Sequence, residues 1–195
     1  MNARSLLLCL LVICAAPAHA GLYGDPGKDV KSGDLNDQDY WWTKYDMTML
    51  DICMKEHQPE GHIGMNLEST NRRLDDLIQK YPNHEGLKAW RQQTADIISK
   101  IDRNANRTDS WKPGCPWDEA NFGQAWVNWR HLHMLLADND RDRAYGLLLN
   151  VRQNFDILLK PGRLNDYPPE LKQWVTDTAP EADKLYADLN KKMHH

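Results

Sequence analysis

The sequence predicts an all-α fold, and three observations support that prediction. Apolar residues recur every three or four positions in several long segments, which is the spacing of one helix face. Proline and glycine stand between these segments, where helices end. No run alternates between apolar and polar residues for long enough to predict a strand. We therefore expect five to seven helices, arranged as an antiparallel bundle or a short stack of αα-hairpins.

The first two helices are predicted before residue 82. One begins near Asp37 and ends at Pro59 and Gly61. Its spaced apolar residues are Trp42, Tyr45, Met49, Ile52 and Cys53. The second helix stops at Pro82, and its apolar face consists of Leu67, Leu74, Leu77, Ile78 and Tyr81.

The third to fifth helices follow with short connections. Asn83 is the expected N-cap of a helix that reaches Ile101, and the polar segment 104–114 is expected to be a loop. Pro116 suits the first turn of the fourth helix, and Asp138 to Asp140 form a turn into the fifth. Short connections favour antiparallel neighbours, so we expect two hairpins, over residues 66–105 and 116–160. The junction from Leu77 to Trp90 is similar to junctions in tetratricopeptide-like arrays.

The C-terminal part predicts two shorter helices. Pro168 begins the first, and Thr178-Ala179-Pro180-Glu181 reads as a capping box that restarts the chain at a bend. Both segments belong to one helical domain that we assign to residues 37–193.

The N-terminus has the pattern of a secretory signal peptide. Arg4 precedes an apolar run from Leu6 to Ile13, and Ala18-His19-Ala20 provides the small residues of a cleavage site. We therefore assign residues 1–20 to a signal peptide and residues 21–36 to a flexible lead-in. The protein is expected to be exported, either to a periplasm or to the extracellular space. Lipid attachment at Cys14 is disfavoured, because isoleucine precedes that cysteine.

The charge and hydropathy of the chain exclude two classes of protein. The 195 residues include 24 Lys and Arg against 28 Asp and Glu, for a net charge of −4, so no basic footprint for nucleic acid is expected. The run at residues 6–13 is too short to span a membrane, which takes about 20 apolar residues.

Export would leave two cysteines, Cys53 and Cys115, in an oxidising compartment. Two cysteines allow one pairing, so the sequence predicts a disulfide between them.

Two histidine-containing segments are candidates for metal or haem binding. His57 and His62 lie beside carboxylates and near Met54, and such donors suit zinc or copper. His133 lies on an apolar helix face, where a histidine and a methionine from another helix could hold non-covalent haem b. Each also has a structural interpretation, as a helix end or a hydrogen-bonded core histidine. No cofactor is required by the sequence.

The eight tryptophans suggest a binding surface. Trp41, Trp111 and Trp117 lie outside the predicted apolar stripes, where exposed indoles could anchor a protein or a cell-wall glycan. No nucleophile elbow, phosphate-binding loop or zincin motif is present, so no enzymatic activity is indicated. The sequence therefore predicts an exported binding or scaffolding module, with a metal- or haem-binding bundle as the alternative.

Overall fold

The computed structural model describes residues 23–24, 30–55, 60–101 and 114–193. These residues form six α-helices and one short 3₁₀ helix, with no strand among them, which confirms the all-α prediction. The elements are α1 (Gln38–Lys55), α2 (Glu60–Lys80), α3 (Glu85–Ile98), η1 (Pro116–Asp118), α4 (Ala120–Ala137), α5 (Arg141–Leu158) and α6 (Pro169–Met193).

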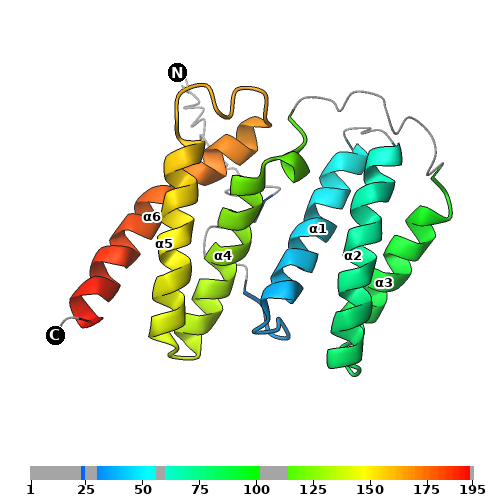
Figure 1. Ribbon diagram of the computed structural model, residues 1–195, viewed down its shortest axis with the longest axis horizontal. Coiled ribbons are helices and arrows are strands. Elements are labelled where there is room, and N and C mark those ends of the chain that lie inside the picture. Colours follow the sequence, from blue (N-terminus) through cyan, green and yellow to red (C-terminus); the bar gives the residue numbers. More distant parts are fainter. Residues whose placement is uncertain (1–22, 25–29, 56–59, 102–113, 194–195) are drawn as a thin grey trace, which may run out of the picture.

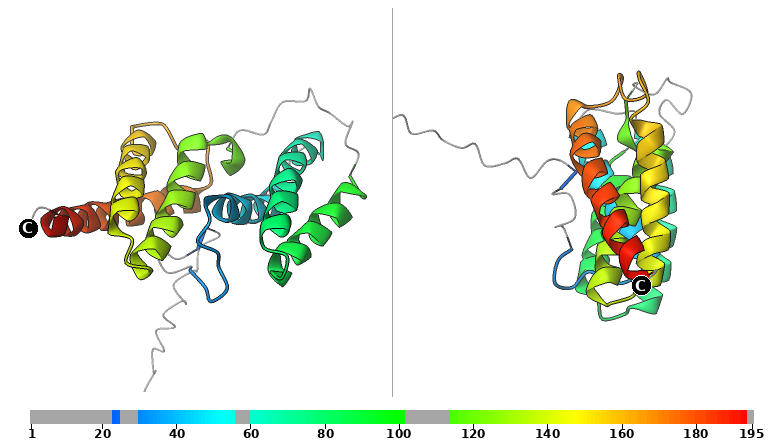
Figure 2. Two further views of the ribbon diagram at one scale, coloured as in Figure 1. Left: turned by 60° about the horizontal axis from the view of Figure 1, so that its bottom comes forward. Right: turned by 90° about the vertical axis from the view of Figure 1, so that its left-hand side faces the viewer.

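The helices stand side by side in a row whose spatial order differs from their order in the chain. From one end to the other the order is α6, α5, α4, α1, α2 and α3, and each helix packs against its neighbours in that row (Figure 1). The two predicted hairpins, α2 with α3 and α4 with α5, are both present. The contact between α1 and α4 joins the two halves, and Figure 2 shows the row from two further directions.

Side chains at the helix ends explain where several helices begin. The imidazole of His84, and not the amide of Asn83, caps α3 by accepting a hydrogen bond from the backbone N–H of Leu87. The carboxylate of Asp140 accepts from the N–H of Arg143 at the start of α5. Asn139 takes a left-handed conformation with φ of 61° in the turn before it, a conformation that asparagine tolerates well.

The predicted bend near residue 180 is wrong. α6 runs continuously through Pro180, and Thr178 lies inside the helix instead of capping a new one. The Thr178 hydroxyl donates a hydrogen bond to the carbonyl of Trp174, one turn earlier. Apolar residues on both sides of the proline, Val175 and Ala182, are fully buried. We infer that burial of one continuous face outweighs the proline's missing hydrogen bond.

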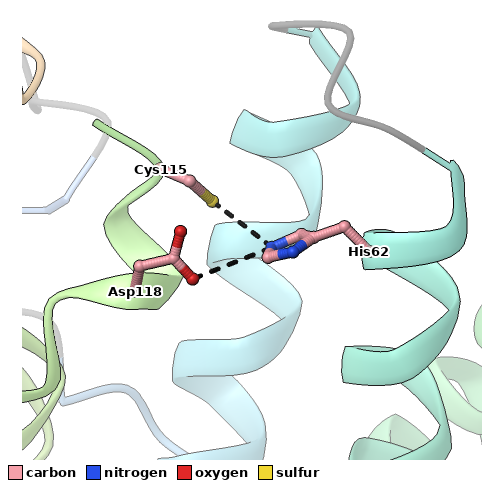
Figure 3. A group of neighbouring side chains, drawn as sticks. All are labelled: His62, Cys115 and Asp118. Carbon is pink, nitrogen blue, oxygen red and sulfur yellow. Dashed lines mark hydrogen bonds and ion pairs between the residues drawn. The ribbon is translucent and has the colours of Figure 1, made fainter. Parts of the chain in front are cut away.

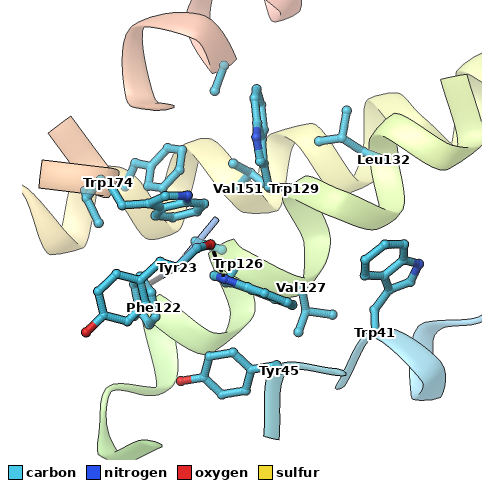
Figure 4. Close-up of a cluster of buried hydrophobic side chains, with 14 of the residues drawn as sticks. Tyr23, Trp41, Tyr45, Phe122, Trp126, Val127, Trp129, Leu132, Val151 and Trp174 are labelled. Carbon is cyan, nitrogen blue, oxygen red and sulfur yellow. Dashed lines mark hydrogen bonds between the residues drawn. The ribbon is translucent and has the colours of Figure 1, made fainter. Parts of the chain in front are cut away.

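The core extends through all six helices, and its part between α1, α4, α5 and α6 is rich in aromatic rings (Figure 4). Trp126 is central: its ring packs near Tyr45, and its indole N–H donates to the carbonyl of Tyr23. The guanidinium of Arg130 lies over the Trp126 ring at 3.6 Å and also donates to the Tyr23 carbonyl. Tyr23 is only 1% exposed and packs edge-on against Phe122, so this residue of the lead-in contributes to the core.

Among the described residues, none of the helices combines the length and the apolar character that a bilayer span requires. The predicted signal peptide, residues 1–20, lies outside the described residues.

Candidate functional site

The two cysteines lie together, but the predicted disulfide is not present. Their sulfur atoms are 2.9 Å apart, whereas a disulfide requires about 2.05 Å. Both residues are thiols, and each is completely buried. The sequence therefore identified the correct neighbours, but the bond between them is absent.

Around this thiol pair the structure assembles an imidazole and a carboxylate. His62 Nε2 lies 3.8 Å from Cys115 Sγ and 4.0 Å from an Asp118 carboxylate oxygen (Figure 3). The three donor atoms all lie within 4.8 Å of one another. Cys53 is in the last turn of α1, His62 in the first turn of α2, and the other two residues are at η1. We call these four residues the junction cluster.

The turn at η1 brings Cys115 and Asp118 toward the same partner. One 3₁₀ turn has three residues, so the N-cap Cys115 and Asp118 lie at its two ends, close together in space. The backbone N–H of Asp118 donates to the carbonyl of Cys115, which closes this turn. Cys115 is the N-cap residue of η1, and Pro116 at its first position favours the required φ.

Two side chains of α1 hold η1 in place. The hydroxyl of Tyr45 donates to the carbonyl of Pro116 at 2.8 Å. The indole N–H of Trp117 donates to Asp46, a carboxylate that also accepts from Arg73 at 2.6 Å. Because these bonds fix η1 against α1, they also fix Cys115 against Cys53.

The electrostatic environment of the junction cluster favours a thiolate. The contact with Cys53 lowers the pKa of Cys115 to about 5, although burial acts in the opposite direction, and the hydrogen bond with His62 adds to the lowering. Burial raises the pKa of the Asp118 carboxyl to about 6, and negative charge on Cys115 contributes to that rise. The thiol and the carboxyl are thus shifted in opposite directions within one small site.

The junction cluster is not arranged as a cysteine–histidine–aspartate nucleophile. In such a triad the base contacts the nucleophile through one ring nitrogen, and the carboxylate holds the other nitrogen. Here Cys115 and Asp118 both approach Nε2 of His62. The sulfur of Cys115 is also inaccessible to a substrate, because the residue is completely buried. Convergence of several donors on one point is instead the geometry of a metal site.

The structure places the metal-binding residues that the sequence predicts in different environments. His62 belongs to the junction cluster, whereas His57 lies outside the described residues. His133 joins no such group among the described residues and packs edge-on against the ring of Trp129. Burial lowers the pKa of His133, as is typical of a core histidine. Met54 is 41% exposed on α1, next to Cys53.

Two of the three predicted tryptophans, Trp41 and Trp117, lie in the part of the chain that the structure describes. Trp41 is completely buried in the core and not exposed as expected. Trp117 is half-buried and donates its N–H to Asp46. Trp111 lies outside the described residues.

Sequence reasoning missed the role of Asp118, which resembles an ordinary acidic residue in the first turn of a helix. The available signal was the spacing Cys115-x-x-Asp118 after a glycine and around a proline. That spacing aligns two side chains only if the turn is 3₁₀, and periodicity does not separate a 3₁₀ turn from the first turn of an α-helix.

The fold and the junction cluster together define an all-α protein with buried thiols and a buried imidazole beside a partly exposed carboxylate, at the meeting point of α1, α2 and η1. No family model matches the chain, and neither a curated protein nor a solved structure is significantly similar to it.

Proposed function

We propose that the protein is an exported helical-hairpin module that binds a segment of a protein partner in a groove between α1 and α3. The observation that carries this proposal is the groove itself, which has a volume of about 600 Å³. Ligand pockets are usually about 300–1,000 Å³, so the groove is large enough for several side chains of a partner.

The lining of the groove favours a protein segment over a glycan. Apolar atoms come from Met54, Ala89 and Ile97, and amide side chains come from two glutamines of α3. No aromatic side chain lines the groove among the described residues, and a sugar ring would lack a stacking surface there. Apolar and amide groups instead suit one face of an amphipathic helix or an extended peptide.

The charges at the groove suggest the sign of the partner's net charge. Asp51 and Asp96 contribute two carboxylates, whereas Lys100 contributes one ammonium group. A segment with apolar anchors and a net positive charge would therefore be complementary to it.

Matched glutamate substitutions test this proposal. Met54 in the groove and Leu149 on α5 are exposed to similar extents, 41% and 43%. The tagged full-length protein and both variants would be expressed in the native host and cross-linked, and the captured envelope proteins would be identified. The proposal predicts one predominant protein partner that Leu149→Glu retains and Met54→Glu loses.

A second measurement would give the affinity for that partner. Gln93→Glu adds negative charge at the groove, whereas Asp96→Lys reverses a charge there. For a basic segment we expect Asp96→Lys to weaken binding about tenfold or more and Gln93→Glu to preserve it. Capture of no protein, or capture that both glutamate variants retain equally, would contradict the proposal.

A further inference from the structure

We propose that Cys53, His62, Cys115 and Asp118 form a binding site for one Zn²⁺ ion when the two cysteines are reduced. This site is separate from the proposed groove, and neither proposal depends on the other. Three stretches of chain supply the donors. Cys53 lies at the end of α1, and Figure 3 shows His62 on α2 with Cys115 and Asp118 at η1.

The distances in the junction cluster are close to those of a tetrahedral zinc site. Zinc binds sulfur at about 2.3 Å and nitrogen or oxygen at about 2.0–2.2 Å, so neighbouring donors lie about 3.3–3.8 Å apart. The observed separations at His62 Nε2 are 3.8 Å to Cys115 Sγ and 4.0 Å to the Asp118 oxygen. The two separations at His62 exceed the tetrahedral values by about 0.3–0.6 Å, and Cys115 Sγ and the Asp118 oxygen lie within 4.8 Å of each other, so the donors would have to approach by up to about 1 Å to share one ion.

Cys53 lies outside the group of three donors that already converge, and it would take the fourth position by moving its sulfur away from that of Cys115 and toward the ion. Its sulfur is 2.9 Å from that of Cys115, whereas two thiolates on one zinc ion lie about 3.8 Å apart. An ion between the two sulfurs would also relieve their mutual repulsion as thiolates.

The chemistry of the donors selects the class of cation. Two soft thiolates, a borderline imidazole and one hard carboxylate form a mixed set in which sulfur and nitrogen predominate, which suits zinc and not magnesium or calcium. His62 and both cysteines are buried, while the Asp118 side chain is 36% exposed. Asp118 therefore lies on the side of the site from which an ion can enter.

One existing contact has to change when the ion binds. The amide nitrogen of Asn66 lies 3.1 Å from His62 Nε2 and 3.3 Å from the His62 carbonyl. Zinc would take the Nε2 lone pair, and the Asn66 amide would keep its bond to the carbonyl. Removing this amide should therefore leave zinc affinity unchanged or increase it, whereas removing a true ligand should reduce it.

The test is a titration of the full mature chain with Co²⁺, a spectroscopic substitute for zinc, followed by competition with Zn²⁺. The protein would be kept reduced with a phosphine, and its thiols would be counted before each titration. The proposal predicts one Co²⁺ per chain, with the sulfur-to-cobalt charge-transfer absorption that only thiolate ligation produces.

The variants separate ligands from neighbours. Asp118→Asn alters a partly exposed carboxylate, so the fold should survive, and we expect at least the tenfold loss of affinity seen on removing outer-shell partners. Cys115→Ser and His62→Gln should abolish the charge-transfer band or weaken binding further. Asn66→Ala and His133→Gln are the controls that should retain it, and circular dichroism would check the fold of every variant.

Several results would overturn the proposal. Reduced protein that gives no charge-transfer band would do so, as would binding that Asp118→Asn and His62→Gln leave unchanged. Thiols that resist reduction in the folded native protein would show that the pair serves as a covalent link and not as zinc ligands.

Discussion

Gly114 is the residue whose conformation positions the start of the junction cluster. It precedes Cys115 and has a φ of +90°, a region that side chains other than hydrogen rarely allow. A Cβ atom at this position would lie 1.8 Å from the carbonyl oxygen of Asp166, which is backbone and cannot rotate away. Glycine is therefore required both by the turn and by the close approach of another loop.

We expect Gly114→Ala to lower the free energy of unfolding by about 2 kcal/mol or more, through strain and steric overlap. Gly146→Ala is the matched control, because a Cβ there meets open space on α5 and alanine favours the helix by about 0.5–1 kcal/mol. Urea unfolding followed by circular dichroism measures both. Equal stability of the two variants would mean that Gly114 does not position η1.

Asp34 is a second residue with a defined energetic role. Burial of its carboxylate would raise the pKa, but hydrogen bonds from the Lys31 N–H, Lys44 and Tyr40 together lower it below the usual 3.8. The folded state therefore binds this proton less readily than the unfolded state. The stabilisation is complete above pH 3.8 and is lost as the pH falls through the lower folded-state value.

We expect Asp34→Asn to cost about 1–3 kcal/mol at neutral pH, because it weakens charge-assisted hydrogen bonds. The difference from the wild type should shrink as the pH falls below 3.8. Asp76→Asn, at an exposed position on α2, should leave stability almost unchanged at every pH. Urea unfolding as a function of pH measures the three proteins, and a pH-independent difference for Asp34→Asn would contradict this interpretation.

At the scale of the helices, Pro180 shows how local sequence signals can mislead. Thr178-x-x-Glu181 has the pattern of a capping box, and proline cannot donate the backbone hydrogen bond of a helix interior. The helix nevertheless continues, and Pro180 itself is exposed while Val175 and Ala182 are buried. The strength of such packing was not visible in the sequence, because it depends on α5, which lies alongside α6.

We expect Pro180→Ala to stabilise the protein by about 1–3 kcal/mol, because alanine restores a hydrogen bond to the carbonyl of Thr176. Pro169→Ala is the control: it replaces the first residue of α6, where no such bond is lost, so the effect should be small. Thermal unfolding compares the variants. A destabilised Pro180→Ala protein would show that α6 requires a kink at this residue.

The other helices and the junction cluster also show what the sequence could and could not predict. Apolar spacing predicted α1 to α5, although α1 and α4, in the middle of the row, bury residues on most of their circumference and not on one face alone. The cysteine count predicted that Cys53 and Cys115 are neighbours, because they are the two cysteines outside the predicted signal peptide. Neither pattern could predict that His62 and Asp118 join them, since that depends on the packing of α1 against α2 and on the geometry of η1.

At the scale of the whole molecule, contacts between residues far apart in sequence attach the N-terminal segment to the row of helices. Tyr23 precedes all six helices, yet its carbonyl accepts hydrogen bonds from Trp126 and Arg130 of α4. Its ring packs against Phe122 at a centroid distance of 5.3 Å. The beginning of the described chain is thereby attached to the centre of the row.

We expect Tyr23→Ala to destabilise the protein by about 3 kcal/mol, the usual cost of removing a large aromatic side chain from a core. Leu149→Ala removes an exposed apolar side chain and should change stability by less than about 0.5 kcal/mol. Guanidinium unfolding monitored by tryptophan fluorescence compares the two. A negligible effect of Tyr23→Ala would mean that the lead-in does not contribute to the core.

The junction cluster also concerns the whole molecule, because it lies where the two halves of the row meet. X-ray absorption spectroscopy of the reduced, zinc-loaded protein tests its assignment most directly, since the spectrum reports the atoms bound to the ion. The assignment predicts two sulfur neighbours at about 2.3 Å and two nitrogen or oxygen neighbours at about 2.0–2.2 Å. A first shell of nitrogen and oxygen alone would contradict it, because the ion would then lie away from Cys53 and Cys115.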